Sequence, residues 1–219
     1  LATGLTVAAL VAAMVPLVLI VGYVISRGAS IMSWAFLTDD IPILTRDLGP
    51  GMGPAVVGTL LITGAATVMA VPLGILGGIY LNEYSAGSAM GRVVRFMAEV
   101  MTGVPSIVMG LFIYTIFVLR FGVSGFAGAL ALACLMLPVL IRTTEEMLKL
   151  VPADLRESAY ALGGRRAGTI MRVVLPAAAP GIISGALLAV ARAAGETAPL
   201  IFTILTVNET NTNLFHGPN

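Results

Sequence analysis

Five stretches without a charged residue limit what this chain can fold into. They cover residues 1–26, 48–82, 100–119, 121–141 and 173–191, and each is 19 residues or longer. About 20 apolar residues cross a lipid bilayer as a helix, so these stretches predict membrane spans at about 5–25, 55–80, 99–119, 124–141 and 179–205. Only 11% of the residues are charged, whereas soluble domains have about a quarter. We therefore predict an all-α membrane protein in which residues 1–219 form one transmembrane domain.

The two ends of the chain suggest a longer natural protein. The first residue is Leu1 rather than Met, and the sequence stops at Asn219, soon after the fifth predicted span. We expect both ends to be truncated and a sixth span to be missing. The first stretch lacks the basic region that opens a signal peptide, so we interpret it as a span.

The distribution of Lys and Arg predicts the orientation of the spans. The loops after the second and fourth predicted spans carry eight basic residues, whereas the loops after the first and third carry Arg27, Arg46 and Arg120. Basic loops stay on the cytoplasmic side of a membrane. We therefore predict a cytoplasmic N-terminus and a cytoplasmic loop over 142–178. The net charge of +1 gives no indication of a nucleic-acid partner.

Small residues at a spacing of four predict close helix packing inside the bundle. Gly74 and Gly78 form one such pair, and Gly181 and Gly185 form another. Such pairs let two helix backbones approach each other. The lone Cys134 is expected to be an apolar packing residue. Neither it nor the lone His216 supports a metal site.

The loop 142–178 carries the signals of two short helices. Pro152 suits the first turn of a helix, Asp154 complements its N-terminus, and Gly163 suits its C-terminal end. Leu155, Ala159 and Leu162 recur at helical spacing and predict one apolar face. We expect a second helix near 166–174, ended by Pro176 and meeting the first at an angle.

The residues of this loop resemble a known motif. Glu157, Ser158 and Ala159 are followed by Gly163 and, nine residues later, by Val-Val-Leu-Pro ending in Leu175 and Pro176. This spacing is similar to the EAA motif of type I ABC-importer permeases. The resemblance implies that these six residues belong to a helical element that docks on a separate ATPase and transmits its motion. No GxxxxGK[ST] phosphate loop is present, so ATP must bind to another chain.

Two charges interrupt the fifth predicted span. Arg192 and Glu196 are four residues apart, which would place them on one helix face, within hydrocarbon depth. An ionisable residue there costs at least about 2.5 kcal/mol and should face protein, water or substrate. The pair is either a structural salt bridge or an anion-selective point in a translocation path. Arg suits the second role because its planar guanidinium can hold two oxyanion oxygens and stays protonated.

A second resemblance concerns the whole chain. The run from Ala191 to Leu200, which includes Thr197, is similar to the A-type permease subunit of high-affinity phosphate importers, as are residues 58–61, 71–74 and 79–84. The resemblance implies half of a pore for inorganic phosphate and no enzymatic activity in this chain. It also implies six spans, with the missing one at the C-terminal end. It also implies a second, C-type permease, an ATPase homodimer holding ATP and Mg, and an extracytoplasmic phosphate-binding protein.

Alternatives remain open from the residues alone. An arginine cannot by itself distinguish phosphate from sulfate, molybdate or tungstate. Ser106, next to the break at Pro105, either lines the path or satisfies nearby backbone. An intramembrane enzyme would need a catalytic constellation, and the sequence has no HExxH or GxSxG motif. A purely structural membrane subunit would leave the EAA-like motif unexplained.

Overall fold

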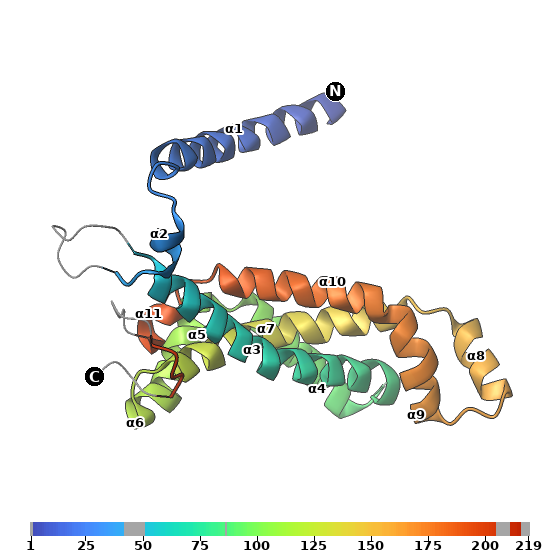
Figure 1. Ribbon diagram of the computed structural model, residues 1–219. Helices are drawn as coiled ribbons and strands as arrows, with labels where there is room; N and C mark the ends of the chain where they lie inside the picture. Colours follow the sequence, from blue (N-terminus) through green and yellow to red (C-terminus); the bar gives the residue numbers. More distant parts are fainter. Residues whose placement is uncertain (1, 42–50, 86, 205–210, 216–219) are drawn as a thin grey trace. The chain divides into compact units, whose positions relative to one another are not determined.

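The computed structural model describes residues 2–41, 51–85, 87–204 and 211–215 (Figure 1). Arg46, His216 and the last residue of the fifth predicted span lie outside these ranges. Every regular element among the described residues is helical. The chain divides into two compact units, with the boundary between Val56 and Val57, near the start of the helix Gly53–Ile79.

The first unit contains a long apolar helix and a short one. Helix α1 covers Ala2–Gly28, and helix α2 covers Trp34–Thr38. The side chains of α1 are exposed along its length, and the helix is long and apolar enough to cross a membrane. Helix α2 begins where the Ser33 hydroxyl accepts a hydrogen bond from the Phe36 N–H at 3.1 Å. That bond satisfies one of the donors a helix leaves unpaired at its N-terminus.

The second unit is a helical bundle whose longer helices are connected by short ones. Three of its segments are single π-helical turns, labelled η. The elements from the N-terminal side are α3 (Gly53–Ile79), η1 (Tyr80–Tyr84), α4 (Ala89–Gly103), α5 (Ser106–Ile113), η2 (Tyr114–Val118), α6 (Leu119–Phe121), α7 (Gly125–Lys149), α8 (Ala153–Ala161), α9 (Arg166–Thr169), η3 (Ile170–Val174), α10 (Leu175–Ala194) and α11 (Leu200–Thr203).

Helix α7 is the centre of this bundle. It packs against α10, α4, α5 and α11, and α10 runs alongside it in Figure 1. The main core joins α3, α7 and α10 through mostly small side chains: Ala66, Ala70, Ala129, Leu132, Ala133, Met136, Leu140, Ala189 and Ala193. Small side chains allow close backbone approach, the usual source of packing in membrane helices.

The paired glycines make this close approach possible. A Cβ on Gly74 would lie 2.4 Å from the Cβ of Leu140, and one on Gly185 would lie 2.2 Å from Cγ2 of Thr143. Gly78 and Gly181 are similarly close to side chains of α7. The prediction that these pairs serve packing within the chain is confirmed.

Four described helices are long and apolar enough to span a membrane, within α1, α3–η1, α7 and α9–α10.

The predicted span at 99–119 is not one straight helix, because α4 and α5 meet at a bend of 108°. The break falls at Val104 and Pro105, both in extended conformations. Proline has no N–H to donate and disfavours helical geometry in the preceding residue, which explains the bend.

In residues 142–178 the structure agrees with the prediction in the first half and differs from it in the second half. Helix α7 continues to Lys149, and α8 follows Pro152 as predicted. The expectation that Pro176 ends a helix is wrong, since α9, η3 and α10 form one continuous helix over Arg166–Ala194. Pro176 lies in the first turn of α10, directly after the π-helical turn η3. The changed hydrogen-bond spacing of a π turn can accommodate a residue that lacks an N–H.

Candidate functional site

Arg192 and Glu196 lie at the C-terminal end of α10. The helix ends at Ala194, and the N–H of Gly195 donates to the Arg192 carbonyl at 3.1 Å. Glu196 therefore follows the helix, and the expectation that both charges share a face of one continuous helix is wrong. Gly195 and the nearby Pro199 account for the break, because glycine weakens a helix and proline cannot continue one.

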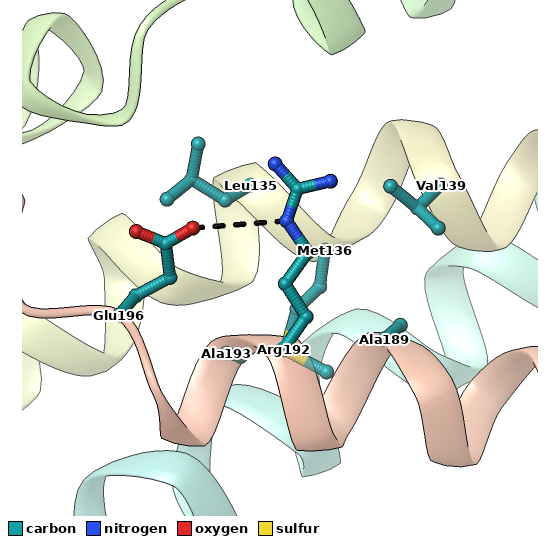
Figure 2. Close-up of a pocket in the computed structure, with 7 residues that line it drawn as sticks. All are labelled: Leu135, Met136, Val139, Ala189, Arg192, Ala193 and Glu196. Atoms are coloured by element: carbon teal, nitrogen blue, oxygen red, sulfur yellow. Dashed lines mark ion pairs between the residues drawn. The ribbon is translucent and has the colours of Figure 1, made fainter. Parts of the chain in front are cut away.

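The two charges form a loose ion pair (Figure 2). The Nε of Arg192 lies 3.7 Å from Oε1 of Glu196, beyond hydrogen-bond distance. The Arg192 side chain is 67% exposed, whereas that of Glu196 is 20% exposed. A guanidinium has five N–H donors. The geometry therefore leaves the donors of Arg192 available to another acceptor while Glu196 holds the group nearby.

A small pocket surrounds this pair. Leu135, Met136 and Val139 of α7 line one side, and Ala189 and Ala193 of α10 line the other (Figure 2). Among the residues that line this pocket, Arg192 and Glu196 are the two with polar side chains. The arrangement is suited to a small oxyanion that enters at the exposed guanidinium.

The structure does not bring the other two predicted translocation residues into this pocket. Thr197 is exposed in the segment between α10 and α11, and it does not line the pocket. Ser106 is half-buried at the first position of α5 and is likewise absent from the lining. Pro199 packs closely on Gly110 of α5, since a Cβ on Gly110 would lie 2.6 Å from the Cα of Pro199.

The EAA-like residues lie at the opposite end of the second unit, where Figure 1 shows α8 and α9. Glu157 and Ser158 are exposed on α8, and Ala159 is half-buried. After α8, Gly163 has φ of +82° and donates its N–H to the Tyr160 carbonyl at 2.9 Å. This left-handed residue ends the helix, as the sequence predicts, because glycine adopts that conformation without steric cost.

Helix α8 exposes apolar as well as polar side chains. Leu155 of α8 is 44% exposed, Leu162 directly after the helix is 91% exposed, and no described residue of α8 is buried. In the predicted apolar face, Leu155 and Leu162 are therefore exposed, and only Ala159 is half-buried. An exposed apolar face bordered by charges is typical of a protein interaction site.

Leu175 and Pro176 mark where the α8 region joins the long helix α10. Leu175 packs against a buried cluster that contains Leu148, Val174 and Ala178. Pro176 is exposed in the first turn of α10. The motif thus reaches from an exposed helix to a residue packed in the bundle.

Sequence reasoning missed two buried carboxylates near α8. Glu83 is 7% exposed and pairs with Arg156, and Glu145 is 1% exposed and pairs with Arg95 and Lys149. The spacing of Glu145 and Lys149 on α7 was a usable signal for one pair. Glu83 and Arg156 are 73 residues apart and gave none.

Long apolar helices, a pocket with an exposed arginine and a surface helix at the other end are features of a membrane transport subunit. A family model described as "Binding-protein-dependent transport system inner membrane component" matches residues 70–208, and the chain belongs to this family. It is therefore an integral membrane protein.

Curated relatives agree with this family. The chain is 45% identical over 211 residues to "Phosphate transport system permease protein PstA 1" of Mycobacterium tuberculosis, covering 94% of this chain and 69% of the relative. It is 47% identical over 191 residues to the PstA protein of Yersinia pestis, covering 87% of this chain and 64% of the relative. The resemblance drawn from the sequence is confirmed, and relatives named as permeases support a transport subunit rather than an enzyme.

A solved structure shows the same fold. A chain of the MetNI methionine ABC transporter, in an inward-facing conformation, matches with a TM-score of 0.58 and 21% identity, covering 63% of this chain and 67% of that chain. At this identity the likeness concerns the fold alone. It confirms the predicted ABC-importer permease fold.

Proposed function

We propose that this chain is a permease subunit of an ATP-driven importer of inorganic phosphate. In this proposal it forms half of the translocation pore, and a second, C-type permease forms the other half. The names of relatives at 45% and 47% identity support phosphate as the cargo. The observation on which the proposal depends most is the exposed guanidinium of Arg192 on an apolar pocket, loosely held by Glu196.

Arg192 is the proposed phosphate contact. A tetrahedral oxyanion can accept two parallel hydrogen bonds from one guanidinium. The 3.7 Å separation from Glu196 means that phosphate need not break a direct hydrogen bond to reach these donors. Glu196 repels the anion and attracts the arginine, so it favours release. A site that holds its cargo weakly can load and unload in each transport cycle.

The α8 region is the proposed contact with the ATPase. Glu157, Ser158, Ala159 and Gly163 would dock α8 on an ATPase homodimer, which holds the ATP and Mg that this chain does not bind. Leu175 and Pro176 would carry the motion into α10. From Leu175 to Arg192 the helix rises about 25 Å. The α8 end and the N-terminus are proposed to be cytoplasmic, and a phosphate-binding protein would deliver cargo from the other side.

Substitution of Arg192 tests the anion contact. The complex of both permeases and the ATPase, with the binding protein, is reconstituted in lipid vesicles, and uptake of radiolabelled phosphate is measured. Arg192→Ala should lower uptake about 10- to 100-fold, since it removes a charged hydrogen-bond donor, while the complex still assembles. Arg120→Ala, which removes an exposed arginine on α6, is the matched control. Normal uptake by the Arg192→Ala complex would contradict the assignment.

Replacing the anion tests the cargo. In the same vesicles, radiolabelled sulfate, molybdate or tungstate replaces phosphate, each with its own binding protein, and uptake of each anion is measured. Phosphate should be the only one of the four that is transported. Uptake of another oxyanion in place of phosphate would leave the permease assignment intact and reject phosphate.

Glu196→Gln tests the release step. Removing this negative charge should lower the KM for phosphate and also lower kcat, because the anion binds more tightly and leaves more slowly. A raised KM would show that Glu196 supports binding instead.

A further inference from the structure

Three arginines from three different elements converge on η1, the π-helical turn that follows α3. Arg95 of α4 donates from Nη2 to the Leu81 carbonyl at 2.7 Å. Arg166 of α9 donates from Nη2 to the Glu83 carbonyl. Arg156 of α8 donates from Nη1 to the Glu83 carboxylate. All three acceptors belong to the π-helical turn η1, so this turn is a meeting point for elements that are distant in sequence.

The end of a helix explains why cations gather here. The last carbonyls of a helix lack an N–H partner within the helix and carry partial negative charge. In η1 two of these carbonyls accept from arginines, and the guanidinium of Arg166 also lies 4.8 Å from the centre of the Tyr84 ring. The buried carboxylate of Glu83 adds a full negative charge at the same place. The turn therefore attracts positive side chains through its backbone and through Glu83.

Glu83 is held on more than one side. Besides Arg156, the Asn82 side-chain amide donates to Oε1 of Glu83 at 2.8 Å. Arg156 in turn donates from Nη2 to the Leu148 carbonyl of α7 at 2.8 Å. One guanidinium on α8 thus connects the end of α3 to the end of α7.

A second carboxylate extends these connections. Oε1 of Glu145 on α7 accepts from Nε of Arg95 at 2.7 Å and from Lys149 at 2.7 Å. Because Arg95 also donates to Leu81, α4, α7 and η1 are joined through one side chain. The network is built around two buried carboxylates, and each needs its partners because an unpaired buried charge is costly.

Helix α8 depends on this network for its position. None of its described residues is buried, and its backbone packs against α9 and η3. Apolar packing therefore does little to hold α8 against α3 and α7. Besides the short covalent link to α7 through residues 150–152, the contacts of Arg156 with Glu83 and Leu148 attach α8 to η1 and α7.

We propose that η1 anchors α8 to the membrane helices, and that Glu83 is the positioning residue that keeps the movement of α8 coupled to α3 and α7. This inference rests on the proposed function, in which an ATPase moves α8. It adds a route through side chains to the covalent connections of α8, which join it to α7 through residues 150–152 and to α10 through α9. Without the Glu83 anchor, ATP hydrolysis continues but moves the membrane helices less.

The first test compares transport with ATP hydrolysis in the reconstituted complex. Glu83→Gln keeps the shape of the side chain and removes its charge. Phosphate uptake per ATP hydrolysed should fall about tenfold, within the range reported for residues that couple two sites. Glu146→Gln, which changes an exposed carboxylate next to Glu145, is the control and should leave the ratio unchanged. An unchanged ratio in the Glu83→Gln complex would overturn the proposal.

The second test does not depend on the cargo. Hydrogen exchange of residues 153–161 is followed by mass spectrometry in the assembled complex. Glu83→Gln should speed exchange of these amides about tenfold, because local opening becomes easier when an attachment is lost. Unaltered exchange would overturn the anchoring role. If the unmutated complex takes up no phosphate, the proposed function fails, but this comparison still tests the anchor.

Variants of Arg156 test the same pair from its other side, so the proposal can still be tested if the Glu83→Gln chain misfolds. Arg156→Gln should reproduce the effect of Glu83→Gln, and the double variant should add nothing further, as expected for two residues acting as one pair. Arg156→Lys keeps the charge but cannot donate to both Glu83 and Leu148 in the same way. It should give an intermediate ratio and intermediate exchange. Independent, additive effects of Glu83→Gln and Arg156→Gln would overturn the pairing.

Discussion

The contact of α3 with α7 at Gly74 can be tested with a single methyl group. A Cβ there would lie 2.4 Å from the Cβ of Leu140, whereas ordinary van der Waals contact begins at 3.4 Å. The two helices would have to separate by about 1.0 Å at this point. The Cβ of Leu140 is fixed to its backbone and cannot move aside, so Gly74→Ala disturbs the main core.

The expected cost follows from two opposing effects. Overpacking in a close contact costs about 1–3 kcal/mol, while alanine favours a helix over glycine by about 1 kcal/mol. Gly64, on the same helix, is exposed and has nothing within 4 Å of a Cβ. Gly64→Ala should therefore show only the favourable effect. The two variants should differ by about 2 kcal/mol, or about 4–8 °C in Tm.

The assay heats the purified complex in detergent and follows the folded fraction by size-exclusion chromatography of a fluorescent fusion of this chain. Gly74→Ala should melt below Gly64→Ala. Equal Tm values for the two variants would refute the close packing of α3 on α7. Matched expression levels in both samples exclude a difference in membrane insertion.

Three further predictions follow from the same structure. Gly185→Ala should lower Tm more than Gly181→Ala in that assay, since the first meets the branched side chain of Thr143 and the second meets the flexible end of Met147; the reverse order would contradict the geometry. Gly163→Asp should reduce co-purification of the ATPase because φ of +82° is strained for aspartate and a charge is added, whereas Gly163→Asn, which tolerates this region better and stays neutral, should retain more of it. Glu145→Gln should lower stability by about 2 kcal/mol, measured as Tm, since it leaves Arg95 and Lys149 without their buried partner; a change no larger than that of Glu146→Gln would count against the network.

Local signals in the sequence predicted the parts of the fold that depend on neighbouring residues. Pro152 and Gly163 delimit α8 because a proline at the start and a left-handed glycine at the end act over one or two residues. Runs of apolar residues predicted the long helices for the same reason. Arg192 and Glu196 were found because a charge in an apolar stretch is costly wherever the chain folds.

The features that the sequence did not predict depend on contacts between distant segments. The pairing of Glu83 with Arg156 requires that α3 end beside α8, and no local pattern indicates this. The π-helical turns η1 and η3 contain ordinary residues, and the arginines that donate to the Leu81 and Glu83 carbonyls of η1 are distant in sequence. The position of Glu196 was misjudged because Gly195 alone gave only a weak breaking signal inside an apolar run.

The continuity of the helix through Pro176 changes how motion would reach Arg192. The sequence predicted a joint at this proline, which would let α9 turn without moving α10. The structure has one helix from Arg166 to Ala194, and a helix resists bending far more than a loop does. Under the proposed function, a displacement of α9 therefore moves the end of α10, where Arg192 faces the pocket. Arg166 contacts η1 at the other end of this helix, so one continuous helix connects the proposed anchor at η1 with the proposed anion contact at Arg192.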